Sequence, residues 1–325
     1  MGDPTGIGPE IIVKALSMEE PFYACRPLVF GDRGVLLKTI EMLGEATTVE
    51  VTETVPEEGY CAQKIFLIHL SQLEITSLQF GKPNRACGKA MVRYVEEAVK
   101  YVRRGRLDAI TTCPINKQSI HSAGYPFSGH TELLAHLAQT PSVAMMFLGL
   151  KWKIVLVTTH LPLRDVSRWI TKDRIVSTIR LTEEGLTKYF GITHPRIAVL
   201  GLNPHSGEGG LLGEEERLEI MPAIIEARSQ ELEVEGPFPA DSFFGLSNHL
   251  AFDVVVSMYH DQGLIPVKMS DFQEAVNLTL GLPFIRTSVG HGTAYDIAGG
   301  GSANSANLIK AILWASKLSK LKINQ

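Results

Sequence analysis

The chain has 325 residues, of which 45% are hydrophobic, so it can bury a large core and is long enough for two domains. Its formal net charge is −4 and only 20% of its residues are charged, which argues against a broad positive surface for nucleic acid or an anionic membrane. The four cysteines are too far apart for a CxxC motif, and no apolar run approaches the roughly 18 residues of a membrane span. These features predict a soluble, unexported protein of the reducing cytoplasm.

A glycine-rich segment, GDPTGIGPE over residues 2–10, opens the chain. Its glycines permit tight backbone geometry, and Pro9 and Glu10 suit the first turn of a helix that continues through residues 11–16. The segment resembles a loop-to-helix anion site, but it fits neither the GxGxxG nor the Walker A pattern. On its own it predicts only a turn followed by a helix.

Short apolar, β-branched runs then alternate with longer amphipathic ones along the chain. In the clearest unit, apolar residues follow a helical period from Met91 to Val102, Gly105 suits the helix end, and residues 107–113 are typical of a buried strand. This alternation is the βαβ signature of a parallel sheet covered by helices. It predicts an α/β fold.

The segment SGHTELLA places Gly129, His130 and Thr131 just before a predicted helix whose first turn carries Glu132. Two interpretations stay open for it. It is either a plain helix cap or a place where the His130 and Thr131 side chains contact a ligand.

Three strand-like runs follow, each ending in a polar segment with a histidine. The runs cover residues 153–159, 196–202 and 253–258, and the histidines are His160, His205 and His260. Ligands in open α/β sheets bind beyond the carboxyl ends of the strands, so the three segments can deliver their imidazoles to one crevice. Three neutral imidazoles with an open fourth position suit Zn²⁺ or a similar ion that must still accept a substrate. Any one of them could equally be an ordinary loop histidine. Their shared placement favours a metal site.

A basic and polar set, Lys268, Asn277 and Arg286, comes soon after the third histidine. Arginine offers a planar fork to an oxyanion and lysine a point charge, so the pair could hold a phosphorylated acid in a chain without an overall positive field. A lone lysine or arginine is more often a solvated surface charge. Arg286 is the stronger candidate because it lies between an apolar, turn-prone stretch and a glycine-rich loop.

That loop, HGTAYDIAGGGSAN over residues 291–304, carries Asp296. A carboxylate there could accept hydrogen bonds from both ribose hydroxyls of an adenosine and would repel a 2′-phosphate, which predicts a preference for NAD. The alternative is a flexible loop without a ligand.

With these residues in hand, the chain resembles the 4-hydroxythreonine-4-phosphate dehydrogenase family of the vitamin B6 pathway over nearly its whole length. The motifs that carry the resemblance occur in family order: GDPTGIGPEI, GHTELLA, THLPLRDV, GLNPHSGEGG, GPFPADSFF, YHDQGLIPVK and NLTLGLPFIRTSVGHGTAYDIAG. The resemblance implies a two-lobed α/β/α fold like that of isocitrate and isopropylmalate dehydrogenases, and a homodimer with its active site at the subunit interface. We place the first lobe at residues 1–130 plus 281–325 and the second, with the metal site and the dimer interface, at 131–280.

The resemblance also assigns roles to residues. It gives the metal to His160, His205 and His260, one of them supplied by the partner chain. Substrate contacts fall on His130, Thr131, Lys268, Asn277 and Arg286. Because residues 291–304 resemble the HGSAPDIAG adenosine loop of isopropylmalate dehydrogenases, cofactor contacts fall on His291, Asp296, Ile297 and Asn304.

The activity that the resemblance implies is the NAD- or NADP-linked oxidation of 4-phosphooxy-L-threonine, dependent on zinc, magnesium or cobalt. The oxidised product then loses carbon dioxide to give 3-amino-2-oxopropyl phosphate. Asp241 and His130 are our candidates for proton transfer. Three alternatives stay open: a paralogue acting on 4-phospho-D-threonate or 4-phospho-D-erythronate, a metal-dependent hydrolase, and a non-catalytic binding protein.

One departure from the family pattern concerns the first residues. Members usually have a short apolar strand before the MGDP motif, whereas this chain starts at Met1 of that motif. Two explanations stay open: a start codon assigned too late, or a strand that is absent. If the strand is absent, we expect unpaired backbone groups in the sheet and a weaker core.

Overall fold

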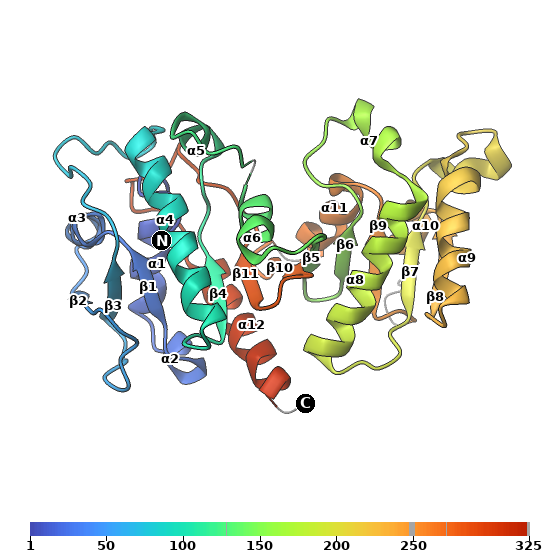
Figure 1. The fold of residues 1–325 in the computed structure, drawn as a ribbon. Helices are drawn as coiled ribbons and strands as arrows, with labels where there is room; N and C mark the ends of the chain where they lie inside the picture. The colour runs from blue at the N-terminus through green and yellow to red at the C-terminus, as the bar shows by residue number, and fades with distance from the viewer. Residues whose placement is uncertain (128, 247–250, 271, 324–325) are drawn as a thin grey trace. The chain divides into compact units, whose positions relative to one another are not determined.

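The computed structural model describes residues 1–127, 129–246, 251–270 and 272–323, which form two compact units (Figure 1). Unit 1 comprises Met1–Thr140 and Leu282–Lys320, and unit 2 comprises Pro141–Gly281 and Leu321–Gln325. Both units combine strands with covering helices, so the fold is of the α/β class that the alternating pattern predicted. Among the described residues, no helix has both the length and the apolar character needed to cross a bilayer.

Unit 1 contains a three-stranded parallel sheet and a separate parallel pair of strands. The sheet has the order β1-β3-β2, and β4 pairs with β11. Its elements are α1 (Gly8–Leu16), α2 (Glu20–Ala24), β1 (Leu28–Gly31), α3 (Arg33–Leu43), β2 (Thr48–Val51), β3 (Lys64–His69), α4 (Arg85–Arg103), β4 (Ala109–Thr112), α5 (Lys117–Ser122), α6 (His130–Ala138), β11 (Ile285–Val289) and α12 (Ala306–Ile323).

The core of unit 1 joins segments from both ends of the chain. Apolar side chains of α1 and α3 pack with those of β1 and β3, and α12 adds Leu308 and Ile309 to the same cluster. The predicted helix through residues 91–102 is the middle of α4, and Gly105 follows it with a φ of 68°. A positive φ is a conformation that glycine adopts without strain, which explains the helix end at this point.

Unit 2 contains six strands in the order β10-β5-β6-β9-β7-β8. Its elements are β5 (Ala144–Leu148), β6 (Lys153–Leu156), α7 (Leu163–Trp169), α8 (Lys172–Phe190), β7 (Ile197–Leu200), the turn η1 (Pro204–Gly210), the π-helical turn η2 (Glu216–Ile220), α9 (Met221–Ser229), β8 (Val234–Phe238), α10 (Ala240–Gly245), β9 (Val254–Ser257), α11 (His260–Ser270) and β10 (Val276–Leu280). The strands predicted over residues 153–159, 196–202 and 253–258 are β6, β7 and β9.

The sheet of unit 2 is mixed, which corrects the expectation of a purely parallel sheet. β5 pairs antiparallel with both β6 and β10, while β6, β9, β7 and β8 are parallel. Only residues 149–152 separate β5 from β6. So short a connection cannot make the crossover that parallel neighbours need, and the two strands must therefore form a hairpin.

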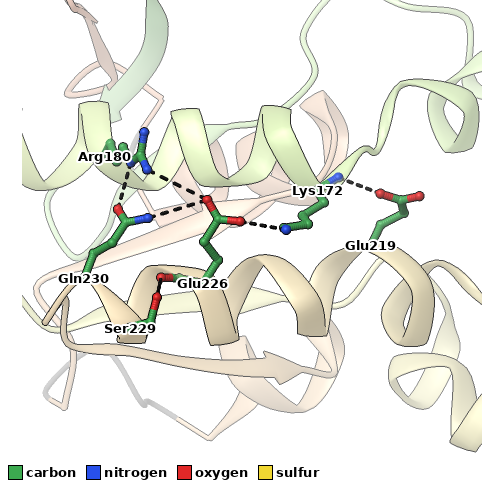
Figure 2. A network of polar contacts seen from close by, with 6 residues as sticks. All are labelled: Lys172, Arg180, Glu219, Glu226, Ser229 and Gln230. Atoms are coloured by element: carbon green, nitrogen blue, oxygen red, sulfur yellow. Dashed lines mark hydrogen bonds and ion pairs between the residues drawn. The ribbon is translucent and has the colours of Figure 1, made fainter.

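Polar contacts hold the helices α8 and α9 together (Figure 2). Glu226 on α9 lies 2.7 Å from Lys172 Nζ, and Arg180 on α8 donates to Gln230 at 2.8 Å. At the beginning of α8, the Lys172 backbone N–H donates to Glu219 Oε2 of η2 at 2.6 Å (Figure 2). A single exposed ion pair contributes little to stability. The hydrogen bond from the Lys172 backbone matters more to the helix, because the first N–H groups of a helix have no partner within it.

Candidate active site

The three predicted metal histidines follow three strands that are neighbours in one sheet. His160, His260 and His205 come after β6, β9 and β7, which lie side by side in that order and run parallel. Their carboxyl ends therefore lie at the same edge of unit 2, which is where ligands bind in such sheets.

His160 and His260 lie close together at this edge. Their ring centroids are 5.8 Å apart, with 43° between the ring planes. Two imidazoles on one Zn²⁺, each nitrogen about 2.0–2.1 Å from the ion, have ring centres on the order of 5–6 Å apart. The pair therefore fits a shared divalent ion.

A carboxylate orients His260. Its Nδ1 lies 2.7 Å from Asp261 Oδ1. A carboxylate at this distance favours the ring form with its proton on Nδ1, in which the Nε2 lone pair is available to a metal.

His205 lies in η1, a turn of unusual backbone geometry. Five successive residues from His205 to Gly209 have φ between 43° and 77°. Three of them, His205, Ser206 and Glu208, carry a β-carbon, and the left-handed conformation is unfavourable by roughly 1–2 kcal/mol for each such residue. Surrounding contacts must hold this turn in place, and backbone strain of this kind often lies at functional sites.

Within the described ranges of this one chain, no three His, Cys, Asp or Glu side chains come together closely enough to hold a metal ion. The structure thus brings two of the three predicted imidazoles together, and His205 follows the adjacent strand as an exposed residue. The coordination of all three to one ion stays a prediction.

Two side chains that sequence reasoning missed connect the histidine-bearing segments. Thr158, two residues before His160, donates to the Met258 carbonyl at 2.7 Å. Gln262 accepts a hydrogen bond from the Met258 backbone N–H at 2.7 Å and donates to the Gly201 carbonyl at 2.7 Å. Side-chain hydrogen bonds therefore connect the end of β6 to that of β9, and the end of β9 to that of β7, in addition to the backbone pairing of the sheet.

Two predicted substrate residues, Arg286 and His130, belong to unit 1, where Arg286 is buried and His130 is half-buried. Arg286 on β11 is 2% exposed and donates through Nη2 to Thr112 Oγ1 at 2.6 Å. Burial lowers the pKa of Arg286 to about 9. Burial, and then the Arg286 charge, lower the pKa of His130 well below its usual value, so this imidazole is neutral at physiological pH. A buried cation beside a neutral imidazole suits an anionic ligand.

Neither His130 nor Thr131 caps α6. The cap position is Gly129, which has no side chain to accept a hydrogen bond, and His130 is the first residue of the helix. The segment therefore begins the helix, as the first of the two interpretations expects, with Gly129 as the cap and without a side-chain hydrogen bond. The interpretation in which these side chains contact a ligand stays a prediction.

The other two predicted substrate residues belong to unit 2. Asn277 on β10 is 7% exposed, and its Oδ1 has no hydrogen-bond partner among the described residues. A buried acceptor without a donor is unfavourable, so this atom is suited to a ligand that donates. Lys268 on α11 is half-buried, with its Nζ 5.3 Å from the ring centre of Phe272. Asp241, a proton-transfer candidate, is exposed in the first turn of α10.

The predicted cofactor loop, residues 291–304, lies against α1 and the segment before it. Tyr295 donates to Asp3 Oδ2 at 2.5 Å, and the Gly299 backbone N–H donates to Glu10 Oε1 at 2.6 Å. Lys14, one turn after Glu10, donates to the carbonyls of Gly301 and Ala303, at 2.6 Å and 2.8 Å. The glycine-rich N-terminal segment therefore supports this loop.

The four predicted cofactor residues differ in their surroundings. Asp296 and Ile297 are exposed. His291 Nδ1 lies 3.1 Å from the Gly292 carbonyl oxygen. Asn304 Oδ1 accepts from the Ala306 backbone N–H at 2.8 Å, so this side chain also begins α12. The first three are the better placed to contact a cofactor.

The supporting residues had little signal in the sequence. Gln262 lies two residues after His260, and that proximity could have suggested a role for it. Asp3 and Tyr295 are 292 positions apart, and only the folded chain shows their contact.

Comparison with known proteins places the chain in one family. The family model of pyridoxal phosphate biosynthetic protein PdxA matches residues 23–315. The chain is 50% identical to a protein of Desulforapulum autotrophicum named 4-hydroxythreonine-4-phosphate dehydrogenase, over 97% of this chain and 93% of that protein. It is 43% identical to the D-threonate 4-phosphate dehydrogenase of Cupriavidus necator, over 98% of this chain and 95% of the relative. The crystal structure of 4-hydroxythreonine-4-phosphate dehydrogenase from Klebsiella pneumoniae matches with a TM-score of 0.89 at 38% identity, covering 98% of each chain. The chain therefore belongs to the pyridoxal phosphate biosynthetic protein PdxA family.

Proposed function

We propose that this protein is a dehydrogenase that oxidises the hydroxyl of 4-phosphooxy-L-threonine with NAD⁺ in pyridoxal phosphate biosynthesis. The keto acid formed then loses carbon dioxide to give 3-amino-2-oxopropyl phosphate. The observation that carries the proposal is the closeness of His160 and His260 in a chain of this family. Their ring centroids lie 5.8 Å apart, at the neighbouring ends of the parallel strands β6 and β9.

One divalent ion, zinc, magnesium or cobalt, is the proposed ligand of His160, His205 and His260. When bound, it would supply Lewis-acid chemistry for the oxidation of a hydroxyl and for the loss of carbon dioxide from a β-keto acid. Asp261, with Oδ1 2.7 Å from His260 Nδ1, would favour the tautomer that presents Nε2 to the ion.

The substrate is proposed to contact His130, Thr131, Lys268, Asn277 and Arg286. Arg286 and Lys268 would attract its phosphate and carboxylate, because both are cations in a chain of net charge −4. Asn277 Oδ1, buried without a donor, would accept a hydrogen bond from the substrate. His130 and Asp241 are the proposed groups for proton transfer. The lowered pKa of His130 keeps its ring neutral before the reaction.

The nicotinamide cofactor is proposed to bind His291, Asp296, Ile297 and Asn304, with NAD preferred to NADP. Exposed Asp296 is available to the ribose hydroxyls, and α1 holds the surrounding loop in place.

We also propose a homodimer with a shared active site, in which the two units correspond to the two lobes expected from the sequence. Ile265, Met269 and Phe272, on or just after the helix that begins with His260, are 57%, 81% and 57% exposed. Exposed apolar side chains gathered in one segment favour an interface. All four cysteines are free thiols, which fits a cytoplasmic location.

The test is a substrate panel with purified protein, NAD⁺ and added Co²⁺ or Zn²⁺. We expect kcat/KM to be highest for 4-phosphooxy-L-threonine, and alanine substitution of His160 or His260 to remove most activity while the circular dichroism spectrum stays unchanged. No NADH formation from any phosphorylated hydroxy acid in the presence of metal would refute the proposal.

The second candidate substrate is 4-phospho-D-threonate or 4-phospho-D-erythronate. The observation in its favour is the 43% identity to the D-threonate 4-phosphate dehydrogenase of Cupriavidus necator. These substrates carry a hydroxyl where phosphothreonine carries an amine, so the same panel separates the two candidates. A higher kcat/KM for the threonate or erythronate would select the second.

A further inference from the structure

The turn that carries His205 is contacted by one buried carboxylate. Glu216, the first residue of η2, is 6% exposed, and its Oε1 accepts from the backbone N–H groups of Leu202 and Asn203, each at 2.7 Å. Its Oε2 accepts from Asn203 Nδ2 at 2.9 Å. Both oxygens are therefore occupied by donors of the segment between β7 and His205.

The carboxylate also fits closely against two glycines on either side of His205. A β-carbon at Gly201 would lie 3.1 Å from Glu216 Oε1, and one at Gly207 would lie 2.7 Å from Oε2. At the second distance, any side chain at position 207 would require the Glu216 carboxylate to move. Glu216 therefore touches the turn both before and after the histidine, and that turn is the one with five successive left-handed residues.

The π-helical turn η2 is held from its other side by a second carboxylate. Glu219, three residues after Glu216, accepts from the Lys172 backbone N–H at the start of α8 (Figure 2). The two carboxylates of one turn thus face different partners, the histidine turn for Glu216 and helix α8 for Glu219. A single-turn π-helix is rare and is found frequently at functional sites.

We propose that Glu216 is a positioning residue: its carboxylate holds the left-handed turn and so fixes the place of His205. With both oxygens engaged by donors, Glu216 acts through the turn and does not itself coordinate a metal. The consequence for metal binding rests on the proposed function, which assigns His205 to the metal. Groups that orient metal ligands commonly change metal affinity 10- to 100-fold when they are substituted.

The experiment compares Glu216→Gln with Glu219→Gln, which make the same chemical change on the same turn. A glutamine at position 216 would place an amide that donates hydrogen bonds near the donors it must satisfy. The first readout is backbone hydrogen exchange, by mass spectrometry, of peptides covering residues 202–210 in metal-free protein. We expect at least tenfold faster exchange in Glu216→Gln, and rates within about twofold of the unmodified protein in Glu219→Gln.

The second readout is Co²⁺ affinity, followed by calorimetry and by the visible spectrum of the bound ion. We expect Kd to rise about 10- to 100-fold in Glu216→Gln, with an altered spectrum, and to stay within about twofold in Glu219→Gln. If Glu216→Gln does not fold, Asn203→Ala removes the contacts of Nδ2 with Glu216 and with its neighbour Glu215 but keeps the two backbone donors to Glu216. It should change both readouts in the same direction by a smaller factor.

Two outcomes separate this inference from the proposed function. If the unmodified protein binds no Co²⁺, the metal assignment fails, and the exchange rates alone decide whether Glu216 holds the turn. If Glu216→Gln is folded and matches Glu219→Gln in exchange, the positioning role is overturned, whatever the activity.

Discussion

Asp296 is an exposed carboxylate in the loop after β11, and its charge makes a prediction about cofactor choice. A free 2′,3′-diol can donate two hydrogen bonds to it, whereas a 2′-phosphate removes one donor and adds repulsion, at about 1–3 kcal/mol. We therefore expect kcat/KM to favour NAD⁺ over NADP⁺ by roughly tenfold to a hundredfold. Asp296→Lys should narrow or reverse the preference, and equal values in the unmodified enzyme would exclude the ribose contact.

His130 makes a prediction about stability and pH. Its pKa in the folded chain lies well below the ordinary value of about 6.5, so below pH 6.5 the unfolded chain takes up a proton that the folded chain does not. The free energy of unfolding should therefore fall as the pH decreases below about 6.5, by at most about 1.4 kcal/mol per pH unit from this group.

Urea titrations between pH 5 and 7.5 measure this contribution. His130→Gln should flatten the pH dependence. His136→Gln, at an exposed position of the same helix, controls for the loss of an imidazole. Parallel curves for the unmodified protein and His130→Gln would contradict the lowered pKa of His130.

At the scale of elements, the N-terminal segment supports the cofactor loop through Tyr295. We therefore predict that loss of the Tyr295 hydroxyl changes both stability and NAD⁺ binding. Tyr295→Phe removes the hydroxyl that donates to buried Asp3 and also contacts Thr5 and Ser119, which should lower the free energy of unfolding by about 1–3 kcal/mol. Because the loop would then be less well held, KM for NAD⁺ should rise several-fold with kcat nearly unchanged. Tyr23→Phe, at an exposed tyrosine bonded to Glu19, is the control. An unchanged KM would leave Tyr295 with a purely structural role.

The elements also show what the sequence can and cannot predict. β6, β7 and β9 were predictable because each is a continuous apolar run, and runs of that kind form buried strands. The antiparallel β5 and β10 were missed, because an apolar run does not specify the direction of its neighbours. The left-handed geometry at His205, Ser206 and Glu208 was also missed, since none of these residues favours a positive φ strongly enough to indicate it.

The candidate site also has a part that the sequence predicts and a part that it does not. The three motif histidines could be identified because each follows an apolar run that is typical of a strand. Their support by Gln262 and Glu216 depends on which strands are neighbours, a property of the folded chain that no local pattern records.

At the scale of the whole molecule, a shared site predicts complementation between inactive chains. If one imidazole comes from the partner, mixing the alanine variant of that histidine with the alanine variant of either of the other two among His160, His205 and His260 restores one intact site in each mixed dimer. Random mixing should then give roughly a quarter of the unmodified activity, since half of the dimers are mixed. Analytical ultracentrifugation checks the dimer itself. An active monomer, or no recovery in any pairing of dimeric variants, would show that each site belongs to one chain.

The order of the segments along the chain also bears on how the protein folds during synthesis. All the strands of unit 2 lie between residues 144 and 280, so this unit can assemble as soon as that stretch has left the ribosome. Unit 1 cannot, because β11 and α12, which complete its strand pair and its core, are made last. Its first 140 residues must therefore wait, with apolar surface uncovered, while the whole of unit 2 is translated. Long-range closure of this kind slows folding, so we expect the nascent first segment to be prone to aggregation until β11 and α12 are made.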